Sequence, residues 1–310
     1  MPVLALDIGG TKLEAGVVTA DGKLSAAVSR ATDPQALPPQ LLAALLEMAH
    51  EAVRDAGVTW SDLTAAGISY GGPVHFPSGR TVTCHHLPGW EDFPLREEVA
   101  HRAGLRVVMD NDANAAALGE TAFGAARGCR HVLYVTVSTG IGAGLVLDGR
   151  LYRGANSLAG ELGHVLVVPD GPLCTCGRRG CLEAAAAGPA IERAAREALA
   201  AGEPSSLSAG ACTAKDTAQA AATDALAARV MADAGRSLGI ALAGAVNLLN
   251  PEAVVIGGGV AQAGECLWAP LRAAVSEFGV PKSVRDLRLL PAALGARSAL
   301  FGAGALALGD

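Results

Sequence analysis

The sequence predicts an α/β protein built from two similar halves with a cleft between them, and three observations support this prediction. A strand, a turn rich in Gly and Thr, and a second strand open the chain at residues 3–18 and recur at 131–147. Helical periodicity follows each of these hairpins. The 310 residues suffice for two lobes of ordinary size. We therefore expect a duplicated α/β lobe.

In the first half, apolar residues alternate with the period of strands and later recur with the period of helices. Asp21-Gly22 marks a hairpin between the second and third strands. The expected elements are strands over residues 3–6, 13–18, 23–31, 65–70 and 105–109 and helices over 38–56, 95–103 and 113–123.

The second half repeats this order, with Asp148-Gly149 as its hairpin signal. The stretch 202–214, rich in Gly, Ser and Thr, reads as a surface loop rather than a domain boundary. The expected elements are strands over residues 131–137, 142–147 and 253–256 and helices over 184–200 and 216–249.

Composition excludes several classes of protein. Hydrophobic residues make up 51% and charged residues 17%, which excludes a disordered chain. The net charge of −6 offers no basic surface, so we expect no nucleic-acid partner. No apolar run reaches the roughly 18 residues that cross a bilayer, and the first residues lack the basic segment of a leader peptide. We therefore expect a cytoplasmic protein without membrane contact.

The turn DIGGTK comprises Asp7, Gly9, Gly10, Thr11 and Lys12 and directly follows the first strand. Glycines let a backbone approach an anion, and the Thr hydroxyl and backbone N–H groups donate to phosphate oxygens. The spacing differs from that of a P-loop. A hairpin that uses Gly only for its backbone freedom explains this turn about equally well.

Two further glycine turns follow strands. One contains Thr139 and Gly140 in STGIGAG, at the matching place of the second half, which suggests a pair of phosphate-binding hairpins. The other, Gly257, Gly258 and Gly259, fits no dinucleotide-binding spacing. We expect it to open a helix and to leave room for an adenosine or a phosphate at the helix N-terminus.

Asp112 lies where a strand passes into a helix, in the stretch MDNDANAAALGE. Phosphoryl transfer to an alcohol needs a base on the attacking hydroxyl, and an Asp beside the amide of Asn111 suits that task. The alternative is that Asn111 or Asp112 only caps the helix. We interpret Asp110 as a supporting residue.

Four ligand-type residues, His164, Cys174, Cys176 and Cys181, crowd into eighteen positions. A Cys₃His set is typical of structural zinc, and Gly177 and Gly180 allow a tight loop. In a reducing compartment, metal explains the cluster better than disulfides do. Unpaired core cysteines are the alternative.

Taken together and in order, five motifs resemble the ROK family of sugar kinases and sugar-responsive repressors. They are DIGGTK, NDANAAALGE, VSTGIGAG, GELGH and CTCGRRGCLE. The resemblance implies an actin-like ATPase fold of the hexokinase and Hsp70 type, with two lobes and a central cleft. We expect an N-terminal lobe over residues 1–115, a C-terminal lobe with the zinc loop over 116–295, and a last helix, 296–310, that packs back on the first lobe.

Within that family the chain looks most like the bacterial glucokinases, which implies ATP-dependent phosphorylation of glucose at its 6-hydroxyl. Asp112 would be the catalytic base, and structural Zn²⁺ would be held by the Cys₃His set. The implied substrate-binding residues are Gly72, Asn111, Asp112, Glu161, His164 and Glu183. The implied nucleotide-binding residues are Asp7, Gly9, Gly10, Thr11, Lys12, Thr139, Gly140, Gly257, Gly258 and Gly259, with Mg²⁺ near Asp7 through water. Family members are usually dimers or tetramers, so we expect a homodimer or a homotetramer.

Departures from the family pattern keep other activities open. Gly71-Gly72-Pro73, His75 and the run Cys84, His85 and His86 replace the usual residues near the sugar. An alternative is another hexose kinase of the family, acting on N-acetylmannosamine, N-acetylglucosamine, fructose or mannose. A sugar-responsive transcriptional regulator is a further alternative, disfavoured because DIGGTK begins at Asp7 and leaves no room before it for a DNA-binding domain.

Overall fold

The structure is a computed structural model that describes residues 1–83 and 87–309. Cys84, His85 and His86 therefore lie outside the described residues. Internal contacts divide the chain into two compact units. The first comprises Met1–Arg130, Gly144–Ala159 and Ala292–Asp310, and the second comprises His131–Ala143 and Gly160–Pro291.

The first unit contains a five-stranded sheet in the order β3-β2-β1-β4-β7. Its strands are β1 (Val3–Ile8), β2 (Lys12–Val18), β3 (Leu24–Ala31), β4 (Ala66–Tyr70) and β7 (Val107–Asn111). The first three form an antiparallel meander, whereas β4 and β7 run parallel to β1. The parallel strands read as near-continuous apolar runs because both of their faces are covered.

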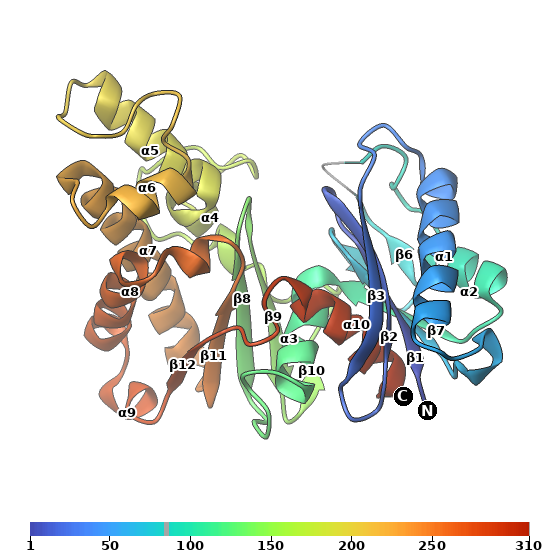
Figure 1. Cartoon of the computed structure of the whole chain (residues 1–310). Coiled ribbons are helices and arrows are strands. Elements are labelled where there is room, and N and C mark those ends of the chain that lie inside the picture. Colours follow the sequence, from blue (N-terminus) through green and yellow to red (C-terminus); the bar gives the residue numbers. More distant parts are fainter. Residues whose placement is uncertain (84–86, 310) are drawn as a thin grey trace. The chain divides into compact units, whose positions relative to one another are not determined.

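Helices cover both faces of this sheet (Figure 1). On one face, α1 (Pro38–Asp55) buries its apolar side against Leu4, Leu6 and Ile8. On the other face, α10 (Ser298–Leu308) contacts β1, β4 and α3 (Asp112–Ala122). A further helix, α2 (Leu95–Ala103), precedes β7.

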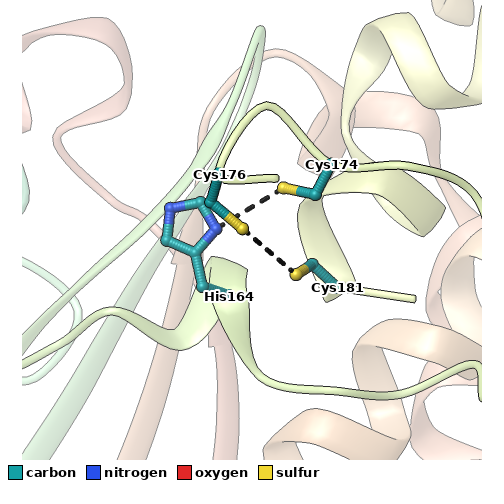
Figure 2. Close-up of side chains that lie close together, drawn as sticks. All are labelled: His164, Cys174, Cys176 and Cys181. Atoms are coloured by element: carbon teal, nitrogen blue, oxygen red, sulfur yellow. Dashed lines mark hydrogen bonds between the residues drawn. The ribbon is translucent and has the colours of Figure 1, made fainter. Parts of the chain in front are cut away.

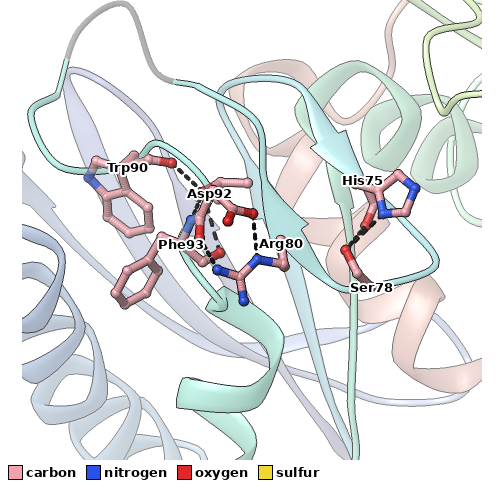
Figure 3. Close-up of polar contacts among 7 residues, drawn as sticks. His75, Ser78, Arg80, Trp90, Asp92 and Phe93 are labelled. Atoms are coloured by element: carbon pink, nitrogen blue, oxygen red, sulfur yellow. Dashed lines mark hydrogen bonds and ion pairs between the residues drawn. The ribbon is translucent and has the colours of Figure 1, made fainter.

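The segment between β4 and α2 contains the short hairpin of β5 (Val74–His75) and β6 (Arg80–Thr81) (Figure 3). His75 Nδ1 lies 2.8 Å from the Ser78 hydroxyl and helps to close the hairpin turn. Arg80 Nε donates to the Asp92 carboxylate at 2.5 Å. The first contact holds the turn of the hairpin, and the second joins β6 to the segment before α2.

The second sheet has the order β10-β9-β8-β11-β12. Its strands are β8 (Val132–Val137), β9 (Ile141–Leu147), β10 (Arg150–Leu151), β11 (Ala253–Gly257) and β12 (Arg288–Pro291). As in the first sheet, a hairpin is followed by parallel strands, since β11 runs parallel to β8 and β12 to β11. The repeated plan confirms the predicted α/β fold of two similar halves.

Six helices belong to the second unit, together with 3₁₀ turns at Leu162–His164 and Val260–Ala263. The helices are α4 (Leu182–Ala186), α5 (Gly188–Ala200), α6 (Ala214–Ala220), α7 (Ala225–Leu249), α8 (Glu265–Phe278) and α9 (Pro281–Val284). Within the described residues, no helix combines the length and the apolar character that a membrane span requires.

Two of the helices differ from the sequence-based expectations. The helix expected over 184–200 is broken at Ala187, which is extended ahead of Gly188-Pro189. The helix expected over 216–249 is two helices, with Asp224 capping the second. Residue 115, the expected end of the N-terminal lobe, lies inside α3, and the first segment of the first unit ends at Arg130; the lobe bounds stay a prediction.

Candidate functional site

Four polar side chains form a row across the first sheet. Asp7 on β1 is paired in register with Glu14 on β2 and with Ser69 on β4, and Ser69 is paired with Asp110 on β7. Paired positions direct their side chains to the same face of a sheet. The row therefore places three acidic groups at the edge of the sheet where β7 passes into the helix that begins at Asp112.

The two outer acids of this row are held by cations. Glu14, which is 1% exposed, lies 2.6 Å from Lys12 Nζ and 2.9 Å from Arg297 Nε. Asp110 is also 1% exposed and lies 2.6 Å from Arg153 Nε. Lys12, expected at the nucleotide, is thus ion-paired within its own strand.

Asp7, in the middle of the row, accepts a hydrogen bond from the Ser69 hydroxyl at 2.7 Å. Burial raises the pKa of Asp7 to about 6, and the nearby negative charge of Asp112 adds to that increase. The Ser69 hydrogen bond and Lys12 oppose it. Asp7 is therefore the member of the row whose charge is least compensated.

The DIGGTK turn is a tight connection between β1 and β2. The Gly9 N–H donates to the Lys12 carbonyl at 2.9 Å, and the Thr32 hydroxyl donates to the Gly9 carbonyl at 2.7 Å. The Thr11 side chain is exposed. The turn joins two antiparallel strands, but Gly9 and Gly10 do not have the positive φ that the hairpin interpretation assigned to them. A side chain at Gly9 would begin 3.0 Å from the Lys12 carbonyl oxygen, and Thr11 remains accessible to a ligand.

At the start of α3, Asn111 is the N-cap, and its Oδ1 accepts from the Asn114 N–H at 2.7 Å. Asp112 is the first residue of the helix, and its side chain is exposed. The Ala113 N–H donates to Asp112 at 2.8 Å. The capping alternative thus applies to Asn111 and leaves the Asp112 carboxylate accessible.

The pKa of Asp112 is raised above its ordinary value because surrounding protein atoms displace water, although part of the side chain remains exposed. The hydrogen bond from Ala113 opposes this increase. A carboxylate with a raised pKa accepts a proton more readily than an ordinary one.

Gly72 follows β4 by two residues, and its N–H donates to the Tyr70 carbonyl at 2.8 Å. Tyr70 is the register partner of Asn111. Gly72 and Asp112 therefore follow the ends of two neighbouring strands, and Asn111 is the last residue of one of them.

In the second unit, the turn that contains Thr139 and Gly140 is linked to Glu183. Glu183 Oε2 accepts from the Ile141 N–H at 3.0 Å, and its Oε1 accepts from the Thr175 hydroxyl at 3.3 Å. A side chain at position 140 would begin 2.8 Å from Glu183 Oε2, so the Glu183 carboxylate would have to move. Thr139 is exposed.

The third glycine turn differs from its expected form. Gly257 ends β11, and Gly258 has a φ of +89°, which glycine adopts readily. The 3₁₀ turn Val260–Ala263 follows, and α8 begins only at Glu265. The helix N-terminus expected beside these glycines is therefore replaced by a 3₁₀ turn.

His164, Cys174, Cys176 and Cys181 converge, with one ligand atom from each lying within 4.8 Å of the others (Figure 2). His164 Nδ1 is 3.6 Å from Cys174 Sγ, and Cys176 Sγ is 3.6 Å from Cys181 Sγ. Ligands at about 2.0–2.3 Å from a tetrahedral zinc ion are separated by roughly 3.3–3.8 Å. The donor set and its spacing therefore fit a closed four-coordinate zinc site.

The surroundings of this cluster connect it to two predicted sugar ligands. His164 Nε2 lies 3.8 Å from the Glu161 carboxylate, so the two ring nitrogens face different partners. Cys181 is the N-cap residue of α4, the helix that carries Glu183 in its first turn. Burial raises the pKa of the Cys181 thiol to about 12, so this thiol ionises only beside a cation.

The sequence analysis named Asp7 and Asp110 of this row. It missed Glu14, Ser69 and Arg153. The strand register that aligns Glu14 and Ser69 with Asp7 becomes visible only when the strands are paired. Arg153 lies 43 positions from the acid it binds. No local motif marks such a partner.

Two sheets with the same strand plan and a polar row at the strand ends define a protein of the actin-like ATPase fold. The chain belongs to the ROK family, whose model matches residues 3–310.

Among relatives, a glucokinase of Thermotoga maritima is 35% identical over 99% of this chain and 97% of its own length. An N-acetylmannosamine kinase of Citrobacter koseri is 34% identical over the full length of both chains. Among solved structures, a ROK hexokinase of Thermus thermophilus is 40% identical, with a TM-score of 0.86 over 99% of this chain and 98% of its own. A ROK family glucokinase of Streptomyces griseus in complex with glucose and AMPPNP is 34% identical, with a TM-score of 0.83 over the full length of both chains.

Proposed function

We propose that this protein transfers the γ-phosphoryl group of ATP to the 6-hydroxyl of glucose, which yields glucose 6-phosphate and ADP. The protein is an ATP-dependent sugar kinase, as its full-length similarity to glucokinases and the AMPPNP complex of one relative support. The observation that carries the proposal is the Asp112 carboxylate, exposed at the start of α3 while Asn111 caps that helix.

In the proposed reaction, Asp112 accepts the proton of the 6-hydroxyl as its oxygen forms a bond to the γ-phosphorus. The bond from that phosphorus to the bridging oxygen breaks, and ADP leaves with the electron pair. Asp112 later releases its proton to water. The raised pKa of Asp112 favours the proton transfer.

The sugar would be oriented by hydrogen bonds from several polar side chains. The Oδ1 of Asn111 is occupied by the helix cap, so its Nδ2 is the group that would donate to a sugar hydroxyl. Glu161, His164 and Glu183 would contact further hydroxyls, since carboxylates and imidazole match groups that both donate and accept. Gly72 would lie beside the sugar.

The three glycine turns would hold the nucleotide. Backbone N–H groups and the exposed hydroxyls of Thr11 and Thr139 are suited to phosphate oxygens. Mg²⁺ would neutralise phosphate charge when it is bound, and Asp7 would hold it through water. Lys12 would reach the phosphates if its ammonium group turned from Glu14.

Zinc would be held by His164, Cys174, Cys176 and Cys181 in a structural role, because a closed Cys₃His set leaves no position for substrate. The residues of this chain would do the positioning: Cys181 begins α4, and α4 presents Glu183. The expected cytoplasmic location, the homodimer or homotetramer, and the absence of a nucleic-acid partner also remain predictions.

The second candidate substrate is N-acetylmannosamine, which the Citrobacter koseri relative favours. The test is a steady-state comparison of glucose, mannose, fructose, N-acetylglucosamine and N-acetylmannosamine, with ATP turnover followed by coupled release of ADP. We expect the highest kcat/KM with glucose. A kcat/KM for glucose below about a tenth of the best value would overturn the glucose assignment.

A further inference from the structure

Arg153 forms an ion pair with Asp110, and the proposed reaction assigns no role to this pair. It lies two residues after β10, within the stretch 144–159 that belongs to the first unit. Its Nε donates to Asp110 Oδ2 at 2.6 Å, and Asp110 is 1% exposed. A charged hydrogen bond this short to a buried carboxylate strongly restricts both side chains.

The guanidinium of Arg153 is itself held in place. Its central carbon lies 3.6 Å from the centre of the Phe76 ring, a cation–π contact. The Phe76 N–H donates to the Ser157 hydroxyl at 3.2 Å, and Ser157 is buried with a φ of +59°. Arg153 and Ser157 thus both contact Phe76 within the first unit.

The other oxygen of Asp110 binds the junction that carries Asp112. Asp110 Oδ1 accepts from the Asn111 N–H at 2.9 Å and from Asn114 Nδ2 at 2.8 Å. Asn114 in turn donates its N–H to Asn111 Oδ1. Asp110, Asn111 and Asn114 therefore form a closed hydrogen-bond network on both sides of Asp112 in the sequence.

The buried side chain of Asn114 is oriented by its hydrogen bond to Asp110. Its side chain is 1% exposed, and its Oδ1 has no hydrogen-bond partner among the described residues. A buried amide oxygen without a partner costs stability. The orientation of Asn114 is therefore set mainly by the Asp110 carboxylate.

We propose that Arg153 is a positioning residue for Asp112 and acts through Asp110. By binding Oδ2, Arg153 fixes the rotation of the Asp110 carboxylate, so that Oδ1 stays aimed at Asn111 and Asn114. These two residues then set the backbone direction at Asp112 and the orientation of the Asn111 amide. This inference rests on the proposed function, since it takes Asp112 as the base.

The test combines Arg153→Met with Asp112→Asn in a double-mutant cycle, using ATP and the best sugar of the panel. Met keeps the aliphatic bulk but lacks the donor. We expect Arg153→Met to lower kcat 10- to 100-fold, with the KM for ATP changed less than threefold. In the Asp112→Asn background, the same change should lower kcat less than twofold, because no base remains to be positioned.

Arg153→Lys keeps the positive charge and should recover kcat to within about tenfold of the unmodified protein. Arg150→Met is the matched control, because Arg150 is exposed on the neighbouring strand β10, and it should leave kcat unchanged. Thermal unfolding of each variant confirms that it is folded at the assay temperature.

A structural role alone would lower kcat by the same factor in both backgrounds, and that result would overturn the inference. Unchanged kcat in Arg153→Met would also overturn it. If Asp112→Asn alone retained full activity, the base assignment would fail, and the positioning role with it. The single variants thus distinguish failure of the inference from failure of the proposed function.

Discussion

Asp7 and Asp112 are carboxylic acids of one unit whose pKa values are both raised by burial, but their partners differ. Asp7 accepts from a side-chain hydroxyl within the sheet, whereas Asp112 accepts from a backbone N–H at a helix start. The pKa of Asp7 is raised to about 6, and that of Asp112 is raised above its ordinary value.

Replacing Asp7 with Asn should stabilise the fold in a pH-dependent manner. The folded pKa of about 6 exceeds the ordinary value of 3.8, so ionisation of Asp7 costs stability progressively as pH rises between these values. Asn mimics the neutral acid. We expect Asp7→Asn to raise the free energy of unfolding by about 1–3 kcal/mol at pH 8 and by less than about 1 kcal/mol at pH 4.

Urea unfolding of both proteins at the two pH values measures this gain. An equal gain at pH 4 and pH 8, or a loss at pH 8, would contradict the raised pKa. The same variant should use ATP poorly, as the proposed site near Mg²⁺ requires.

At the residue scale, the sequence was most informative where chemistry is local. The Cys₃His cluster, Asp112 and the glycine turns were all visible as short motifs. Ser69, Glu14 and Arg153 were not, because their relation to the site depends on strand register or on a contact across 43 positions. Arg297, which binds Glu14 from 283 positions away, belongs with them.

At the scale of elements, the loop that carries the proposed zinc ligands Cys174 and Cys176 leads directly into α4. Cys181 belongs to the ligand cluster and is also the N-cap residue of α4, and Thr175 donates to Glu183 from inside the loop. Loss of the metal should therefore disturb Glu183 and, through Ile141, the neighbouring glycine turn.

Cys176→Ala should lose zinc and sugar affinity together, with the Kd for glucose raised about tenfold or more. Three remaining ligands hold the ion poorly, and the loop then ceases to fix Glu183. Metal content by mass spectrometry and glucose binding by calorimetry measure the two effects. Cys266→Ala, outside the cluster, is the control. Loss of metal without any change in glucose binding would refute the coupling.

The contact between α10 and the first sheet depends on small residues. A side chain at Gly67 on β4 would begin 1.7 Å from the Ala303 carbonyl oxygen of α10. The sequence predicted a last helix that packs on the first lobe, but the closeness of this approach could be seen only in the structure. The breaks at Ala187 and before Asp224 were also missed, because alanine-rich runs continue the helical pattern across them.

Gly67→Ala should therefore destabilise the protein by about 1–3 kcal/mol or more, since backbone rather than a flexible side chain must move. Thermal unfolding would record the lower Tm. A side chain at Gly57 would meet no atom within 4 Å, but Gly57 has a φ of +71°. The loss of stability in Gly57→Ala should therefore be smaller and should measure only the strain of alanine at that φ. A Tm for Gly67→Ala equal to that of the unmodified protein would show that α10 packs less closely.

At the scale of the whole molecule, the repeated order of hairpin and parallel strands was predictable from the two matching glycine turns. The limits of the compact units are not visible in the sequence, because the chain passes between the units more than once and β9 has residues in both. In each sheet, one of the matching glycine turns joins the first two strands of the hairpin, β1 to β2 and β8 to β9.

The proposed reaction requires Asp112 to take the proton of a bound hexose during phosphoryl transfer. A direct test compares kcat and KM for glucose and ATP in the unmodified protein and in Asp112→Asn. We expect a kcat lowered about 10²- to 10⁴-fold in the variant, with the KM for ATP changed only a few-fold. A variant that kept kcat within about tenfold of the unmodified protein would contradict it.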